Sequence, residues 1–152
     1  MKNTDINDIL PEELQHASGA RLVATFYSEA IAALEDAIDA IAHGDIERRY
    51  NSVIVATGLI AELAYALDED AGGKIAQNLG QLYVFILTHL PRVNIDNDPN
   101  PARNAIRLLT PLRDAWDELD AHLDAETETG HPVDATKIAG VGDTAGAALM
   151  TA

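Results

Sequence analysis

Apolar residues recur every three or four positions along four stretches of the chain, the spacing that predicts amphipathic helices. The stretches cover residues 18–42, 46–67 and 74–90, and a last one from about residue 100 to residue 123. Four helices joined by short connections predict an all-α fold, an antiparallel up-down-up-down bundle. The side chains on the four stripes form the expected core: Val23, Tyr27, Ala30, Leu34, Ala37, Ile41, Tyr50, Val53, Thr57, Ile60, Ala64, Leu67, Ile75, Leu79, Leu82, Ile86, Leu90, Ala105, Leu109, Leu112, Trp116, Leu119 and Leu123.

Glycine, aspartate and proline mark the expected helix ends. Gly44 suits the left-handed position that ends a helix, and Asp45 suits the cap of the next one. The glycine pair at 72–73 interrupts the helical pattern before the third helix. Pro91 is expected to end or kink the third helix and Pro111 to bend or break the last, because proline lacks a backbone donor and clashes with the preceding turn.

The pattern divides the chain into three parts. Residues 1–17 form a polar N-terminal segment with room for a short helix, and residues 18–126 form the four-helix bundle. Residues 127–152 contain five threonines and four glycines, so we expect a flexible or weakly helical extension.

Charge and composition exclude several classes of function. The chain has 25 acidic and 10 basic residues and a formal net charge of −15, which disfavours nucleic acid and anionic membrane surfaces as partners. It has no cysteine, and hence no disulfide or thiol chemistry. The first residues lack the apolar stretch of a signal peptide, and the longest apolar run, 82–87, is too short to span a membrane. We therefore expect a cytosolic protein without membrane insertion.

Motifs for metal or catalytic chemistry are incomplete. The segment 96–100 begins like a calcium loop, but Pro101 replaces the required glycine and Arg107 the required carboxylate, which favours a polar turn. Glu13 and His16 form one Glu-x-x-His pair where a di-iron bundle needs two. We therefore expect no enzyme, no cofactor and no metal, and assign no catalytic residue.

A second apolar stripe runs beside the core stripe on each of the two middle helices. Such a broad arc on an acidic protein indicates a groove that receives a partner helix. The alternative is that the small residues among them let the two helices approach closely, and periodicity leaves both interpretations open. The residues of this predicted groove are Ile54, Gly58, Ala61, Tyr65, Ala76, Gly80, Tyr83 and Leu87.

Short motifs over residues 17–120 occur in an order and at a spacing that resemble one family, the FliS flagellar export chaperones. Two features depart from the family pattern: Gly19 follows Ser18 where a proline is usual, and no tyrosine precedes Tyr27. Pro91 and Pro111 also fall within helices that usually lack proline. The motifs are Ala17-Ser18, Leu22-Val23, Tyr27, Ala30-Ile31, Leu34, Ala40-Ile41, Gly44-Asp45-Ile46-Glu47, Ile60, Glu62-Leu63, Leu67-Asp68, Gly72-Gly73, Ile75-Ala76, Asn78-Leu79, Leu82-Tyr83, Asn97-Asp98 and Leu112-Arg113-Asp114-Ala115-Trp116.

The resemblance implies a function in flagellum assembly. It implies a cytoplasmic chaperone that binds the C-terminal segment of flagellin, prevents premature polymerisation and keeps flagellin competent for type III export, with export gate components as further partners. It also favours the groove over close packing for Ile54, Ala61, Tyr65 and Tyr83. Two other classes stay open: an adaptor bundle for another flagellar export or regulatory protein, and a bundle enzyme with a buried carboxylate site.

Overall fold

A computed structural model describes residues 19–128, which form five helices and no strand within that range. The helices are α3 (Gly19–His43), α4 (Ile46–Tyr65), α5 (Glu69–His89), α6 (Pro91–Ile95) and α7 (Asn100–Glu128). The predicted all-α bundle is confirmed. The expected N-terminal segment and all but the start of the C-terminal extension lie outside the described residues.

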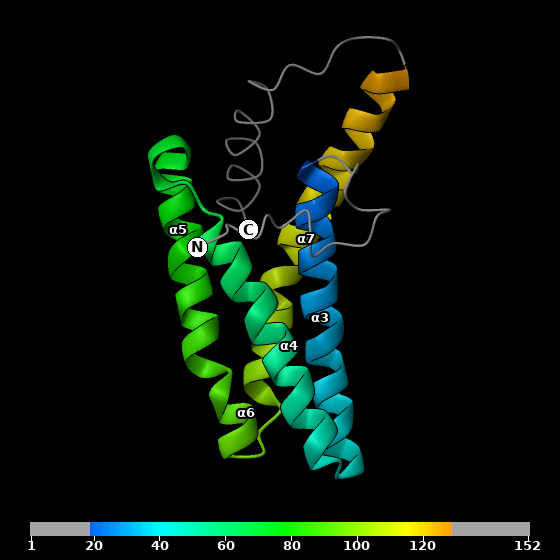
Figure 1. Ribbon diagram of the computed structural model, residues 1–152, viewed down its shortest axis with the longest axis vertical. Helices are drawn as coiled ribbons and strands as arrows, with labels where there is room; N and C mark the ends of the chain where they lie inside the picture. The colour runs from blue at the N-terminus through cyan, green and yellow to red at the C-terminus, as the bar shows by residue number, and fades with distance from the viewer. Residues whose placement is uncertain (1–18, 129–152) are drawn as a thin grey trace, which may run out of the picture.

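The four long helices alternate in direction along the bundle (Figure 1). Helix α3 packs along both α4 and α7, whereas α5 packs mainly against α4 and touches α7 only sparsely. The short α6 lies at the end of the bundle where the chain turns from α5 towards α7 (Figure 1). Helix α3 is therefore the central helix, with α4 and α7 packed along it and α5 attached chiefly along α4.

Most helix ends follow the sequence prediction. Gly44 has a φ of 68°, and the Asp45 side chain accepts a 3.0 Å hydrogen bond from the backbone N–H of Arg48. The predicted glycine break occurs at Gly73, whose φ of 56° interrupts α5. Helix α5 nevertheless begins earlier than predicted, because the Asp68 side chain caps an additional first turn.

The two prolines behave differently. Helix α5 ends at His89 and Pro91 occupies the first turn of the unpredicted helix α6, so the expected break is confirmed there. At Pro111, by contrast, the chain is not interrupted, and α7 is one continuous helix in which the expected bend stays a prediction. Pro111 and Arg107 are both exposed, so the carbonyl that loses its partner lies where water can replace the missing N–H.

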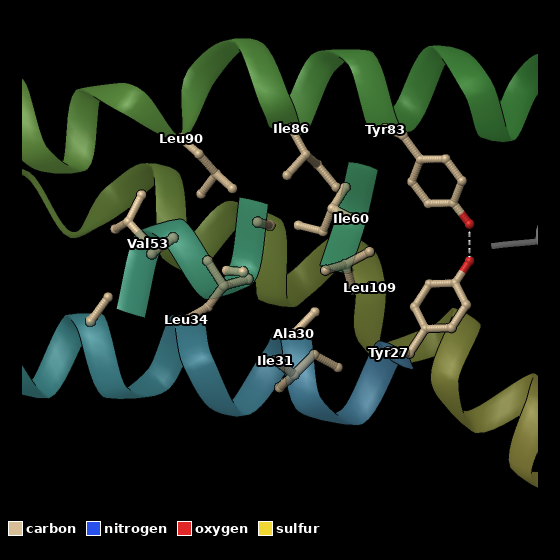
Figure 2. Close-up of a cluster of buried hydrophobic side chains, with 14 of the residues drawn as sticks. Tyr27, Ala30, Ile31, Leu34, Val53, Ile60, Tyr83, Ile86, Leu90 and Leu109 are labelled. Carbon is tan, nitrogen blue, oxygen red and sulfur yellow. Dashed lines mark hydrogen bonds between the residues drawn. The ribbon is translucent and has the colours of Figure 1, made fainter. Parts of the chain in front are cut away.

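The predicted core stripes of α3 and α7 are largely confirmed. Tyr27, Leu34, Leu109 and Leu112 are all fully buried, and they meet Val53, Ile60, Ile86 and Leu90 in one cluster (Figure 2). In Figure 2 the labelled side chains extend from Leu90 to the facing pair Tyr27 and Tyr83, and Leu63 also belongs to the cluster.

The core faces of α4 and α5 differ from the prediction. On α4 the buried residues include Ser52, Ala56 and Leu63, while Tyr50, expected in the core, is 54% exposed. On α5, Ala76 and Tyr83 are buried, whereas Ile75, Leu79 and Leu82 are only half-buried. Helix α5 is thus rotated from the predicted orientation, and its buried side includes two residues that the sequence assigned to the groove.

Candidate binding surface

Four of the predicted groove residues lie together on the outside of α4. Ile54 is 50% exposed and Tyr65 is 89% exposed, and Gly58 and Ala61 between them are exposed as well. Their spacing of four, three and four residues places them on one helical face. A Cβ at Gly58 would meet no other atom within 4 Å. Gly58 and Ala61 therefore do not serve close packing of α4 on α5, and that alternative is wrong for both.

The four predicted groove residues of α5 have different surroundings. Ala76 and Tyr83 are buried, at 4% and 2% exposure. Gly80 faces the α4–α5 connection, since a Cβ there would lie 3.7 Å from Leu67 Cδ1, and Leu87 packs half-buried against the core. The structure thus divides the predicted groove into an exposed set on α4 and a set on α5 that points inward or towards the seam with α4.

Sequence reasoning missed further exposed apolar side chains next to these. Tyr50 lies four residues before Ile54 and extends the exposed stripe by one turn of α4. On α5, Val84 is 61% exposed, directly after the buried Tyr83. The four-residue spacing from Ile54 could have identified Tyr50, but the same residue also matched the core stripe. We call Tyr50, Ile54, Gly58, Ala61 and Tyr65 together the α4 face.

Polar side chains hold α4 against α3 on the side away from this face. The Arg48 guanidinium contacts Asp36 and, at 2.8 Å, Asp39 on α3, and the Ser52 hydroxyl donates to the Asp36 carboxylate. The Arg48 guanidinium, together with the Ser52 hydroxyl, lowers the pKa of Asp36. These contacts fix the rotation of α4 about its own axis.

Arg49, the next residue, holds α4 to the other side of the bundle. Its Nε donates at 3.2 Å to the Asn94 side chain, and its guanidinium also donates to the side chain of Asn97. Asn97 has a φ of 50°, a conformation that asparagine tolerates better than most residues. Arg48 and Arg49 together fasten α4 to α3 and to the α6–α7 turn, which leaves the α4 face outward.

The carboxylates of the segment 96–100, which begins like a calcium loop, make local contacts. The carboxylate of Asp98 accepts a 2.9 Å hydrogen bond from the backbone N–H of Asn100, and Asp96 pairs with Arg92 at 3.4 Å. Within residues 19–128 no three His, Cys, Asp or Glu side chains form a group that could hold a metal ion. In the same range no helix is long and apolar enough to cross a membrane.

The fold and this surface define an acidic helical bundle with an apolar face exposed on α4. The family model for the flagellar protein FliS matches residues 2–123. The chain is 30% identical over 107 residues to the flagellar secretion chaperone FliS of Vibrio cholerae, covering 70% of this chain and 79% of that protein. The chain belongs to the FliS family, and the resemblance seen in the sequence is confirmed.

Other relatives carry similar names. The flagellar secretion chaperone FliSB of Pseudomonas aeruginosa is 28% identical over 105 residues, which cover 69% of this chain and 83% of that protein. The flagellar secretion chaperone FliS of Salmonella typhimurium is 29% identical over 104 residues, which cover 68% of this chain and 77% of that protein. The similarity therefore extends over most of each relative.

Proposed function

We propose that this protein is a cytoplasmic, non-enzymatic flagellar secretion chaperone that binds the C-terminal segment of flagellin. The observation that carries the proposal is the α4 face, an uncharged apolar helix surface that stays exposed in a member of the FliS family. Holding that segment would prevent premature polymerisation and keep flagellin competent for type III export. Components of the export gate are then the next partners of the complex.

The α4 face suits a partner that folds as it binds. From residue 50 to residue 65 it extends about 22 Å at the α-helical rise, enough for about four turns of a partner helix. A disordered amphipathic segment becomes ordered only when apolar contacts offset the entropy that it loses. The exposed rings of Tyr50 and Tyr65, near the two ends of the face, provide large contact areas for this purpose.

The substitution Ala61→Glu tests the proposal, because Ala61 lies in the middle of the α4 face and is exposed. In the free protein the new carboxylate stays hydrated, so the free energy of unfolding should fall by no more than about 1 kcal/mol. Under a bound helix the carboxylate would be buried without a partner, at a cost of about 3 kcal/mol or more. We expect the affinity for a flagellin C-terminal peptide, measured by calorimetry, to fall about a hundredfold.

Ala32→Glu provides the matched control, since Ala32 is an exposed alanine on α3 and the substitution makes the same change of charge outside the α4 face. It should bind the peptide like the wild type. An Ala61→Glu variant that is folded and binds normally, or one that is unfolded, contradicts the proposal. A wild-type protein that fails to bind flagellin but captures another flagellar export protein would favour an adaptor function instead.

A further inference from the structure

Helix α5 is attached to the bundle by few buried side chains. Of its residues only Ala76, Tyr83 and Ile86 are buried, and Leu90 follows directly after its end. By contrast α3, a helix of similar length, buries residues along its whole length from Ala20 to Ala40. Since α5 also touches α7 only sparsely, its position depends strongly on the few groups that it places in the core.

One of these groups makes a directional contact across the bundle. The hydroxyls of Tyr83 on α5 and Tyr27 on α3 share a hydrogen bond, and the two rings point towards each other from opposite sides of the core (Figure 2). Their ring centroids are 6.5 Å apart, and the two residues are 2% and 0% exposed. Among the described residues this is the one side-chain hydrogen bond that joins α5 to another helix.

The hydroxyl pair restricts α5 in a way that the apolar contacts do not. Ile86 and Leu90 lose little if α5 slides or turns slightly, because apolar burial is not directional. A buried hydroxyl that loses its partner is costly, and the two oxygens keep their bond only over a narrow range of distance and angle. The Tyr27–Tyr83 contact is therefore satisfied in one register of α5.

The position of α5 in turn determines what borders the α4 face. Gly80, three residues before Tyr83, lies against the α4–α5 connection, and the exposed Val84 follows Tyr83 directly. Because a helix moves largely as a unit, a shift at Tyr83 displaces both residues. Any partner that lies on α4 and reaches the neighbouring helix would then meet a different surface.

We propose that Tyr27 and Tyr83 are positioning residues, whose hydrogen bond fixes the register of α5 and thereby shapes the surface beside the α4 face. The part of this proposal that concerns affinity for a flagellin peptide rests on the proposed function. Its structural part, the fixed register of α5, stands without any partner.

Three variants separate positioning from simple stabilisation: Tyr27→Phe, Tyr83→Phe and the double variant. Tyr27→Phe leaves the buried Tyr83 hydroxyl without its partner and should lower the melting temperature. Tyr83→Phe should lower it less, because the Tyr27 hydroxyl keeps its hydrogen bond with the Trp116 side chain. The double variant replaces both hydroxyls and should regain most of that loss, because two phenylalanines keep the apolar shape of the pair. We nevertheless expect all three variants to exchange the amide protons of α5 faster than the wild type, with α3 and α7 in the double variant unchanged.

Binding of a flagellin C-terminal peptide provides the second readout. In the double variant the affinity should fall about two- to tenfold, the fold-change that corresponds to the net value of one hydrogen bond. Ile86→Val is the control, since it removes one methylene from the same buried side of α5 and leaves the hydroxyl pair intact. It should lower the melting temperature without weakening binding or selectively accelerating exchange in α5.

The outcomes distinguish this inference from the proposed function. A double variant with wild-type exchange in α5 and wild-type affinity would show that the tyrosines only fill space, and would overturn the inference. If the wild type itself does not bind the peptide, the proposed function fails, and the α5 exchange rates still decide whether the pair fixes the helix.

Discussion

At the scale of single residues, Arg48 and Arg49 matter more for orientation than for stability. Both are partly exposed, and ion pairs such as those of Arg48 contribute little to the free energy of unfolding at such positions. Consecutive residues of a helix point about 100° apart, so one guanidinium reaches Asp36 and the other reaches Asn94 on the opposite side. Together they determine which side of α4 stays free.

The buried tyrosines lead to a prediction about alkaline pH. Burial raises the pKa of both Tyr27 and Tyr83 above the ordinary value of about 10. The folded state therefore favours the protonated hydroxyls, and the stabilisation is complete below about pH 10 and declines as the pH rises above it. We expect both hydroxyls to ionise only as the chain unfolds, in a cooperative step.

Tyrosinate absorbance and helical circular dichroism, recorded over the same alkaline titration, test this expectation. The difference in tyrosinate absorbance between the wild type and the Tyr27→Phe/Tyr83→Phe variant reports ionisation of this pair. It should appear at the same pH as the loss of helix. Ionisation of that part while the helices remain intact would show that the pair is accessible to solvent.

At the scale of the elements, the apolar periodicity predicted which residues are buried on helices with one apolar stripe. It did not predict which side faces the core on helices with two stripes. Helices α3 and α7 each carry one continuous stripe, and their core residues were predicted largely correctly. Helix α5 carries two adjacent apolar stripes. The stripe that faces the core includes Tyr83, whose hydroxyl contacts that of Tyr27, 56 residues away in the sequence. Such a long-range partner leaves no local signal in the sequence.

The same reasoning applies to the surface residues that were missed or misplaced. Tyr50 fits both the core spacing and the spacing of the α4 face, and only the packed structure places it outside. The exposed residues Ile54, Ala61 and Tyr65 were predicted together, because the helical period alone places them on one face. Helix α6 was not predicted, since five residues are too few to show a period.

Two glycines offer a matched test of the helix geometry. Gly73 has a φ of 56° and a ψ of −135° with open space around it, so Gly73→Ala should destabilise through backbone strain alone, by about 1–3 kcal/mol. Gly58 lies inside the regular, exposed part of α4, where Gly58→Ala should stabilise by about 0.5–1 kcal/mol. Chemical denaturation of both variants measures these changes. A stabilised Gly73→Ala or a destabilised Gly58→Ala would contradict the helix geometry described above.

At the scale of the whole molecule, charge and shape explain how an apolar face can stay exposed. The formal net charge of −15 makes copies of the chain repel one another, which opposes self-association through the α4 face. The match to the FliS family, residues 2–123, includes the complete core of the described residues. An uncharged apolar face on a strongly acidic bundle favours a partner whose own contact side is apolar, which agrees with the proposed function.

We propose that flagellin is recognised through its C-terminal segment, and binding to truncated flagellins tests this recognition. The affinity of the full-length chaperone should be measured for intact flagellin, for flagellin without its C-terminal segment and for flagellin shortened equally at its N-terminus. We predict tight binding to the intact and the N-terminally shortened proteins and a loss of measurable binding when the C-terminal segment is absent. Equal binding to all three, or binding to none, would contradict recognition through the C-terminal segment.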